Sequence, residues 1–194
     1  MGGFSKSCAG EPQIRGALRA SAAPLGPMLR LLRDPPTMIR TATISAGLLV
    51  FRRRAELEVL LAHPGGPFWA KKDEGAWSIP KGLTEPGADL LATARREFNE
   101  ETNISLAGIS SPFNPLSPVK QKSGKIVHAF AFEADLDLSS FASNRFEIEW
   151  PPKSGQRLSF PEVDRVAYFA LTAAKIKILG YQLPLLNELE QLVG

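Results

Sequence analysis

Apolar runs of strand length recur along the middle and later parts of the chain. The segment 41–51 (TATISAGLLVF) is rich in β-branched and apolar residues, and 57–62 (LEVLLA) repeats that character after a polar, arginine-rich turn. This pattern predicts a β-hairpin. Further runs of the same kind predict strands at 76–79, 117–122, 125–136 and 164–169.

A helical period interrupts these runs. Leu91, Ala94 and Phe98 recur at i, i+3 and i+7, and Asp89 stands where an N-cap residue would accept hydrogen bonds from the first turn. Two more helices are predicted after the last strand, at 172–178 and 183–192. This mixture of strands and helices predicts an α/β sandwich.

Composition narrows the class of protein. With 44% hydrophobic and 22% charged residues among 194, the chain has the composition of a globular domain with an ordinary core. No apolar run approaches the roughly 20 residues of a membrane-spanning helix. Cys8 is the single cysteine, which excludes an internal disulfide framework and a cysteine-based zinc site. We therefore expect a reducing, cytoplasmic location and no membrane partner.

The net positive charge of the chain comes from residues 1–40. Residues 1–40 hold six Lys/Arg and two Asp/Glu, whereas residues 41–194 hold 17 and 18. Residues 41–194 are nearly neutral, which argues against binding of long RNA or DNA, because proteins that bind long nucleic acids usually have a stripe of basic side chains on their surface. Residues 1–38 are interpreted as a disordered leader, an Arg-rich targeting peptide or the product of an early start codon, since Met28 and Met38 precede the first strand. The folded domain is predicted to comprise 39–194.

Three carboxylates gather on one strip of the central helix. Glu97, Glu100 and Glu101 lie at spacings i, i+3 and i+4, which face the same way and repel one another. Cations among the oxygens relieve this repulsion, and carboxylate oxygens on a rigid element suit Mg²⁺ or Mn²⁺. A solvated acidic face of the helix is the alternative.

The surroundings of these carboxylates resemble the signature of the Nudix hydrolases. Residues 82–104 (GLTEPGADLLATARREFNEETNI) follow the Nudix box G-x5-E-x7-R-E-U-x-E-E-x-G-U, in which U is an apolar residue. The R-E pair of the box falls on Arg96-Glu97, and its E-E pair falls on Glu100-Glu101. The resemblance implies a Nudix-type α-β-α sandwich with a mixed sheet. It also implies a metal site formed by Gly82, Glu97, Glu100 and Glu101, with Arg96 as a positioning group.

Two positions depart from the box. Asn103 replaces the second glycine, a mild change because Asn also adopts the left-handed conformation that ends a helix. Ala88 replaces the first glutamate, which usually supports the metal site. Glu85 and Asp89 are the candidates to compensate for that loss.

The resemblance extends beyond the box. The segments 65–82 and 146–169 look like a bacterial group of predicted NTP pyrophosphohydrolases, and 77–82 and 119–130 are similar to hydrolases of diadenosine polyphosphates and diphosphoinositol phosphates. In those enzymes an acidic residue six positions before an aromatic residue approaches the metals. Glu162 precedes Tyr168 by six, so Glu162 becomes the candidate for an extra ligand or general base.

Basic and aromatic side chains supply further candidates. Lys81, next to the box glycine, suits a phosphate as a point charge. A wall of three lysines is expected to contact a polyphosphate, with two on one strand face by alternation: Lys120, Lys122 and Lys125. Three aromatic residues are candidates for stacking on a base, although such residues more often belong to the core: Phe68, Trp69 and Tyr168.

The sequence therefore predicts Mg²⁺- or Mn²⁺-dependent hydrolysis of a phosphoanhydride bond in a nucleoside polyphosphate. An NTP pyrophosphohydrolase and a dinucleoside polyphosphate hydrolase are both consistent with it. Glu97 or Glu162 would take the proton of the attacking water. Ala88 leaves open a domain that binds nucleotides as a sensor without hydrolysing them. The oligomeric state also stays open, with a homodimer as one alternative.

Overall fold

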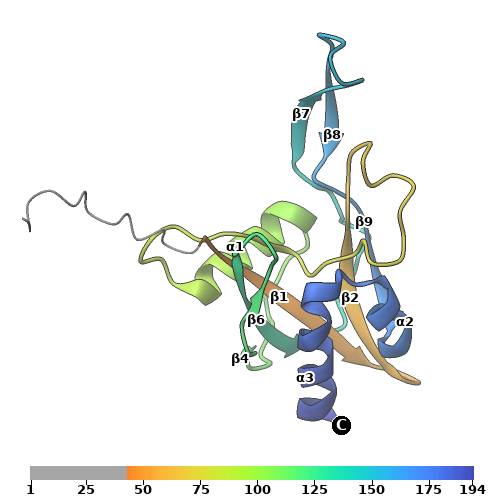
Figure 1. Cartoon of the computed structure of the whole chain (residues 1–194). Helices are drawn as coiled ribbons and strands as arrows, with labels where there is room; N and C mark the ends of the chain where they lie inside the picture. Colours follow the sequence, from red (N-terminus) through yellow and green to blue (C-terminus); the bar gives the residue numbers. More distant parts are fainter. Residues whose placement is uncertain (1–42) are drawn as a thin grey trace, which may run out of the picture. The chain divides into compact units, whose positions relative to one another are not determined.

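Figure 1 shows the computed structural model, which describes residues 43–194. The predicted leader, residues 1–38, lies outside the described residues. The strands are β1 Ile44–Arg53, β2 Leu57–Pro64, β3 Lys81–Leu83, β4 Asn114–Pro115, β5 Val119–Lys120, β6 Ile126–Glu133, β7 Arg145–Glu149, β8 Arg157–Pro161 and β9 Val163–Ala170. The helices are α1 Leu90–Thr102, α2 Leu171–Lys177 and α3 Leu183–Val193, with a 3₁₀ turn at Gly180–Gln182.

Seven strands form one mixed sheet in the order β4-β6-β1-β2-β9, with β3 on β1 and β5 on β6. Strand β1 runs parallel to β6 and antiparallel to β2 and β3. Residues 48–51 of β1 (LLVF) are all buried, because both faces of the sheet are covered. The predicted β1–β2 hairpin is confirmed.

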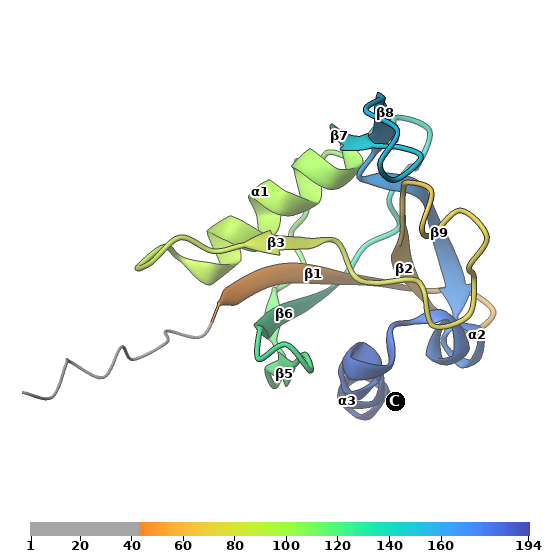
Figure 2. The same cartoon turned by 45° about the horizontal axis from the view of Figure 1, so that its top comes forward.

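Helices lie on both faces of this sheet, α1 on one and α2 with α3 on the other (Figure 2). Alternate positions of the strands therefore feed two cores. Leu48, Leu60 and Phe98 belong to the core under α1, whereas Leu49 and Leu185 belong to the core under α3. The predicted α/β sandwich is confirmed.

Helix α1 begins and ends where its sequence predicts. The Asp89 carboxylate accepts a hydrogen bond of 2.6 Å from the Ala92 N–H, and Asn103 adopts a left-handed conformation with φ 55° at the other end. Ala94 and Phe98 are fully buried. Local signals thus fix the helix that carries the three clustered carboxylates.

Two predicted strands are shorter than expected. The segment 76–79 makes only isolated bridges, Ala62 to Ser78 and Trp77 to Ile178. The reason is that its backbone forms hydrogen bonds with β2 at Ser78 and with the end of α2 and the segment after it at Trp77. Of the predicted strand 117–122, only Val119–Lys120 pairs with β6. The chain then turns, and the Gly124 N–H donates to the Gln121 carbonyl at 2.9 Å.

Strands β7 and β8 form a separate two-stranded sheet that the sequence prediction missed. They pair antiparallel, and this hairpin stands away from the main sheet in Figure 1. Its apolar residues alternate with polar ones, as in Phe146 and Ile148 between charged neighbours. No helix in the described part of the chain is long and apolar enough to cross a membrane.

Candidate active site

Strand β3 brings the backbone of Gly82 directly under the acidic strip of α1. Gly82 pairs with Ala46 of β1, and a Cβ atom at this position would overlap the Glu97 carboxylate. The Glu97 side chain is only 14% exposed. Glycine is therefore required here for close approach rather than for an unusual backbone angle.

Glu101 is largely buried beside the backbone of Lys81. Its Oε2 accepts a hydrogen bond of 3.0 Å from the Lys81 N–H. Burial, and to a smaller extent the negative charges of Glu97 and Glu162, raise the pKa of the Glu101 carboxyl to about 7, although the Lys81 ammonium and N–H oppose the shift. Glu97 and Glu162 are therefore close enough to Glu101 to affect its ionisation.

Arg96 connects the other two carboxylates. Its guanidinium donates to Glu97 Oε1 at 2.6 Å and to Glu100 Oε2 at 2.9 Å, and these partners raise the pKa of Arg96. Because half of the Arg96 side chain is exposed, these bonds contribute only a few tenths of a kcal/mol each. The Arg96 guanidinium thus bridges the Glu97 and Glu100 carboxylates.

The residues present fit a divalent cation that prefers oxygen ligands. Glu97 offers a carboxylate beside the backbone of Gly82 and Glu101 beside that of Lys81, and a cation there would offset the burial and the like charges that raise the pKa of Glu101. Between residues 43 and 194, no three His, Cys, Asp or Glu side chains are already arranged around one point. The hydrogen bonds explain this, since Glu97 and Glu100 turn toward Arg96 and Glu101 turns toward Lys81.

Glu162 comes from the short connection between β8 and β9. Its side chain is exposed, and its charge contributes to the raised pKa of Glu101. The Glu162 N–H donates to the Asn144 carbonyl, and its carbonyl accepts from the Gly65 N–H, both at 2.8 Å. Segments far apart in the sequence thus bring Glu162 to the acidic strip.

The lysines divide into two groups. Burial lowers the pKa of Lys125, as does the positive charge of Lys81, while the charges of Glu101 and Glu97 oppose the shift. Lys81 and Lys125 are therefore both beside the carboxylates. Lys120 and Lys122 are exposed, and they do not share a strand face because the chain turns after Lys120.

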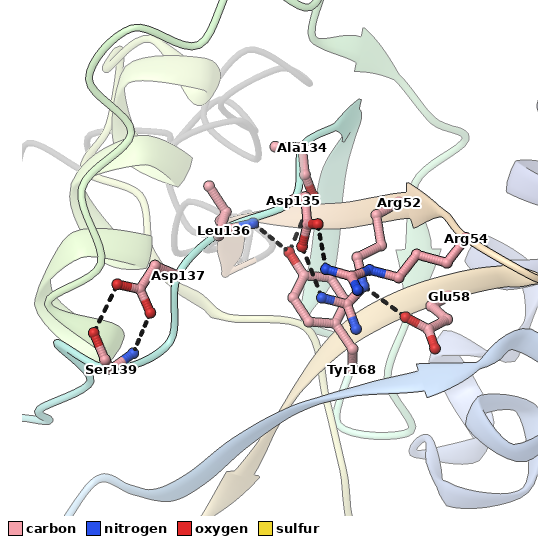
Figure 3. A network of polar contacts seen from close by, with 9 residues as sticks. All are labelled: Arg52, Arg54, Glu58, Ala134, Asp135, Leu136, Asp137, Ser139 and Tyr168. Atoms are coloured by element: carbon pink, nitrogen blue, oxygen red, sulfur yellow. Dashed lines mark hydrogen bonds and ion pairs between the residues drawn. The ribbon is translucent and has the colours of Figure 1, made fainter.

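Tyr168 belongs to a structural network and is not a stacking platform (Figure 3). The Arg52 guanidinium covers its ring at 3.7 Å. Its hydroxyl accepts from the Leu136 N–H and donates to the Ala134 carbonyl, each at 3.0 Å. Burial raises the pKa of this phenol. The expectation that Tyr168 stacks on a base is therefore wrong.

The other aromatic candidates differ in access. Phe68 is 55% exposed and lies edge-on to Trp150 of the hairpin, with ring centroids 5.2 Å apart. Trp69 packs against the core under α3, and the Lys72 ammonium lies 4.5 Å from its ring centre. Only Phe68 presents much of its ring to solvent.

The two acidic neighbours of Ala88 lie at and before the start of α1. The Asp89 carboxylate is engaged as the N-cap of α1, and Glu85 is exposed in the preceding loop. Ala88 and Glu85 instead line a pocket of about 380 Å³ together with the start of β1. Arg96 is satisfied by its two carboxylate partners on α1.

A pocket of about 340 Å³ adjoins the acidic strip. It is lined by polar and small side chains of α1 and of the segment before β7: Asn99, Glu100, Asn103, Ala142, Ser143 and Asn144. Another pocket of about 440 Å³ lies around Arg53 and Leu171. It is at the other end of β1, about 23 Å from the partner of Gly82 at ~3.3 Å per residue, and so is too far to serve the carboxylates.

Comparisons with known proteins agree with this geometry. The NUDIX domain family model matches residues 41–180. An Ap4A hydrolase of C. elegans, solved as a binary complex, has a TM-score of 0.52 and 23% identity, covering 77% of this chain and 97% of that one. The NUDIX domain of Shewanella oneidensis NrtR, complexed with ADP ribose, has a TM-score of 0.51 and 16% identity over 88% and 100%.

A shorter match lies in a mammalian enzyme. The mitochondrial ADP-ribose pyrophosphatase of Rattus norvegicus is 50% identical over 36 residues, which are 19% of this chain and about a tenth of the rat protein. The family model covers well over half of the chain, whereas the solved structures establish the fold alone. The chain belongs to the Nudix hydrolase family.

Proposed function

We propose that this chain hydrolyses a phosphoanhydride bond of a nucleoside polyphosphate or a nucleoside diphosphate derivative, with Mg²⁺ or Mn²⁺ as cofactor. The proximity of Glu97 and Glu101 to the glycine backbone at Gly82 is the observation that carries the proposal. Glu100 completes the metal-binding carboxylates. When bound, the metal ion lowers the pKa of a water and offsets the charge that develops on the scissile phosphate.

The remaining roles follow from the positions of the charged groups. Glu162 or Glu97 accepts the proton of the attacking water. Lys81 and Lys125 bind the phosphates that do not react, because both ammonium groups lie in the field of the same carboxylates. Lys120 and Lys122 are placed further out, where only a long polyphosphate would meet them. Arg96 keeps Glu97 and Glu100 oriented.

The names of similar proteins support two substrate classes. The C. elegans neighbour is an Ap4A hydrolase, and the rat relative is an ADP-ribose pyrophosphatase. Both substrates contain a nucleoside attached to a chain of two or more phosphates linked by anhydride bonds. The polar pocket beside Glu100 supports a nucleoside or ribose next to the scissile bond, since its amide side chains offer donors and acceptors.

Product analysis by ion-exchange chromatography tests the proposal. The panel contains nucleoside triphosphates, dinucleoside polyphosphates and ADP-ribose, each with Mg²⁺, Mn²⁺ or a chelator. We expect turnover that disappears with the chelator and falls by at least about 100-fold in Glu101→Gln, as for the loss of a group acting at the reacting centre. Glu56→Gln is the matched control, because Glu56 is an exposed acid at the other end of β1.

Two outcomes would contradict the proposal. Turnover that persists in the chelator would remove the metal ion from the mechanism. Nucleotide binding without turnover on any substrate would favour the sensor interpretation that Ala88 leaves open.

A further inference from the structure

The position of Glu162 raises a physical problem. An exposed carboxylate in a connection between two strands is ordinarily free to move, whereas a general base or ligand has to be held within a fraction of an ångström. The described structure contains no ion pair to the Glu162 side chain. Whatever orders this residue must therefore act on its backbone.

Three hydrogen bonds hold the backbone around Glu162. Its own N–H donates to the Asn144 carbonyl at 2.8 Å, and its own carbonyl accepts from the Gly65 N–H at 2.8 Å. The next N–H along the chain, that of Val163, donates to the Ser143 hydroxyl oxygen at 2.9 Å. The Ser143 hydroxyl in turn donates to the Asn144 carbonyl at 3.2 Å. Ser143 is the side chain that closes this set of bonds.

The same segment is tied to the helix that carries the metal-binding carboxylates. The Ala142 N–H donates to the Thr102 carbonyl at 3.1 Å, and the Asn103 side chain donates to the Ser140 carbonyl at 3.2 Å. Thr102 directly follows Glu101 in the sequence. A short chain of bonds thus runs from the residue after Glu101, through Ser143, to the residue after Glu162.

The opposite side of Glu162 is equally constrained. A Cβ atom at Gly65 would overlap the Pro161 carbonyl oxygen, so the chain at 65 lies directly against the chain at 161. The β2–β9 register shifts between His63 and Pro64, as in a β-bulge that turns a strand end toward a site. Buried His63 also bonds the Asp164 carboxylate at 2.7 Å.

We propose that Ser143 is a positioning residue, which fixes Glu162 against the end of α1 and so sets the separation of the Glu162 and Glu101 carboxylates. This inference rests on the proposed role of Glu162 in hydrolysis. Ser143 lines the polar pocket beside Glu100, but in this proposal its hydroxyl is engaged by the backbone and does not bind the substrate. Its hydroxyl acts through the Val163 N–H and the Asn144 carbonyl, and its removal leaves both of these groups short of one partner.

The test compares Ser143→Ala with Ser143→Thr, which keeps the hydroxyl. Ser154→Ala is the matched control, because the Ser154 hydroxyl oxygen likewise accepts from a backbone N–H, that of Gln156 at 3.2 Å, but in the hairpin turn. Amide hydrogen exchange of the full chain gives a readout independent of activity. In Ser143→Ala the Val163 amide should exchange at least about tenfold faster, while Ser143→Thr and Ser154→Ala leave it unchanged.

Kinetics then connect the backbone to the reaction. We expect Ser143→Ala to lower kcat on the order of tenfold with KM within about twofold, as for a displaced catalytic group, and Ser143→Thr to restore most of it. In a Glu162→Gln background, Ser143→Ala should cost nothing further. A loss of the same size in both backgrounds, unchanged kcat in Ser143→Ala, or an unaltered Val163 amide would each overturn the proposal.

Different results would contradict the role of Glu162 in hydrolysis and the positioning role of Ser143. If Glu162→Gln alone keeps the wild-type kcat, the role of Glu162 in the proposed function is lost, whatever the amide exchange shows. If Glu162→Gln lowers kcat but Ser143→Ala does not, the hydrolysis mechanism stands and the positioning role of Ser143 is rejected.

Discussion

Replacement of Gly82 by alanine tests the geometry at the centre of the site. The added Cβ would stand where the Glu97 carboxylate now lies. Carbon and oxygen atoms that are not bonded need ~3.5 Å or more between them, so the carboxylate would have to move by about 2 Å. A shift of 1 Å at a reacting centre already costs about 100-fold, and we therefore expect kcat to fall by at least that factor.

Stability should change much less than activity. The atoms in the way are the far end of a flexible side chain that Arg96 already draws toward solvent. Overpacking of this kind costs about 1–3 kcal/mol, and removal of a glycine from the unfolded chain returns about 0.4–1 kcal/mol. We expect a net loss of no more than about 2.6 kcal/mol in the free energy of unfolding, so the variant should remain folded.

The assay measures kcat at saturating Mg²⁺ together with urea unfolding of Gly82→Ala. Gly180→Ala is the control, since nothing lies within 4 Å of a Cβ atom built there. A Gly82→Ala enzyme with kcat within about threefold of wild type would show that Glu97 does not need its place over the glycine, because a 2 Å displacement would then be without effect.

Three further predictions concern single side chains. In a metal-free buffer the free energy of unfolding should fall by about 3 kcal/mol between pH 4.5 and 7, because the folded protein binds the Glu101 proton more tightly than the unfolded chain does. Urea unfolding measures this fall. The same dependence of the free energy of unfolding on pH in Glu101→Gln would contradict the prediction. Tyr168→Phe should lower the free energy of unfolding by about 1–3 kcal/mol through two lost hydrogen bonds, while kcat stays unchanged. Lost activity in a fully folded variant would show that Tyr168 takes part in the reaction. Lys125→Gln should raise KM by about tenfold, in line with one lost charge-assisted contact of about 1.5 kcal/mol, whereas Lys122→Gln at an exposed position should leave KM unchanged. Equal effects of the two variants in steady-state kinetics would show that Lys125 does not bind a phosphate.

The central helix could be predicted from sequence because its signals are local. Asp89 and Asn103 mark its two ends, and the apolar spacing identifies its buried face. The order of the acids along α1 then follows from the helical period alone. The strands β1 and β2 are predictable for a similar reason, since a long apolar run flanks each side of a polar turn.

Elements that depend on distant pairing could not be predicted in this way. The hairpin β7–β8 has the alternation of a strand, but its strands hold only five residues each and its turn contains two prolines. The chain turns at Gln121, so the strand predicted there ends early and Lys122 moves away from Lys120. The proximity of Glu162 to Glu101 came from family resemblance, because no local pattern reveals it.

The site combines features that work against stability with features that favour cation binding. Burial of Glu101 between like charges makes its ionised form unfavourable in the metal-free protein, as the raised pKa records. A divalent cation among these oxygens reverses the balance, since it favours the ionised form. Under the proposed function, the cation would offset this loss of stability at neutral pH. Arg96 provides only partial compensation, because its guanidinium bonds Glu97 and Glu100 and leaves Glu101 to the Lys81 N–H.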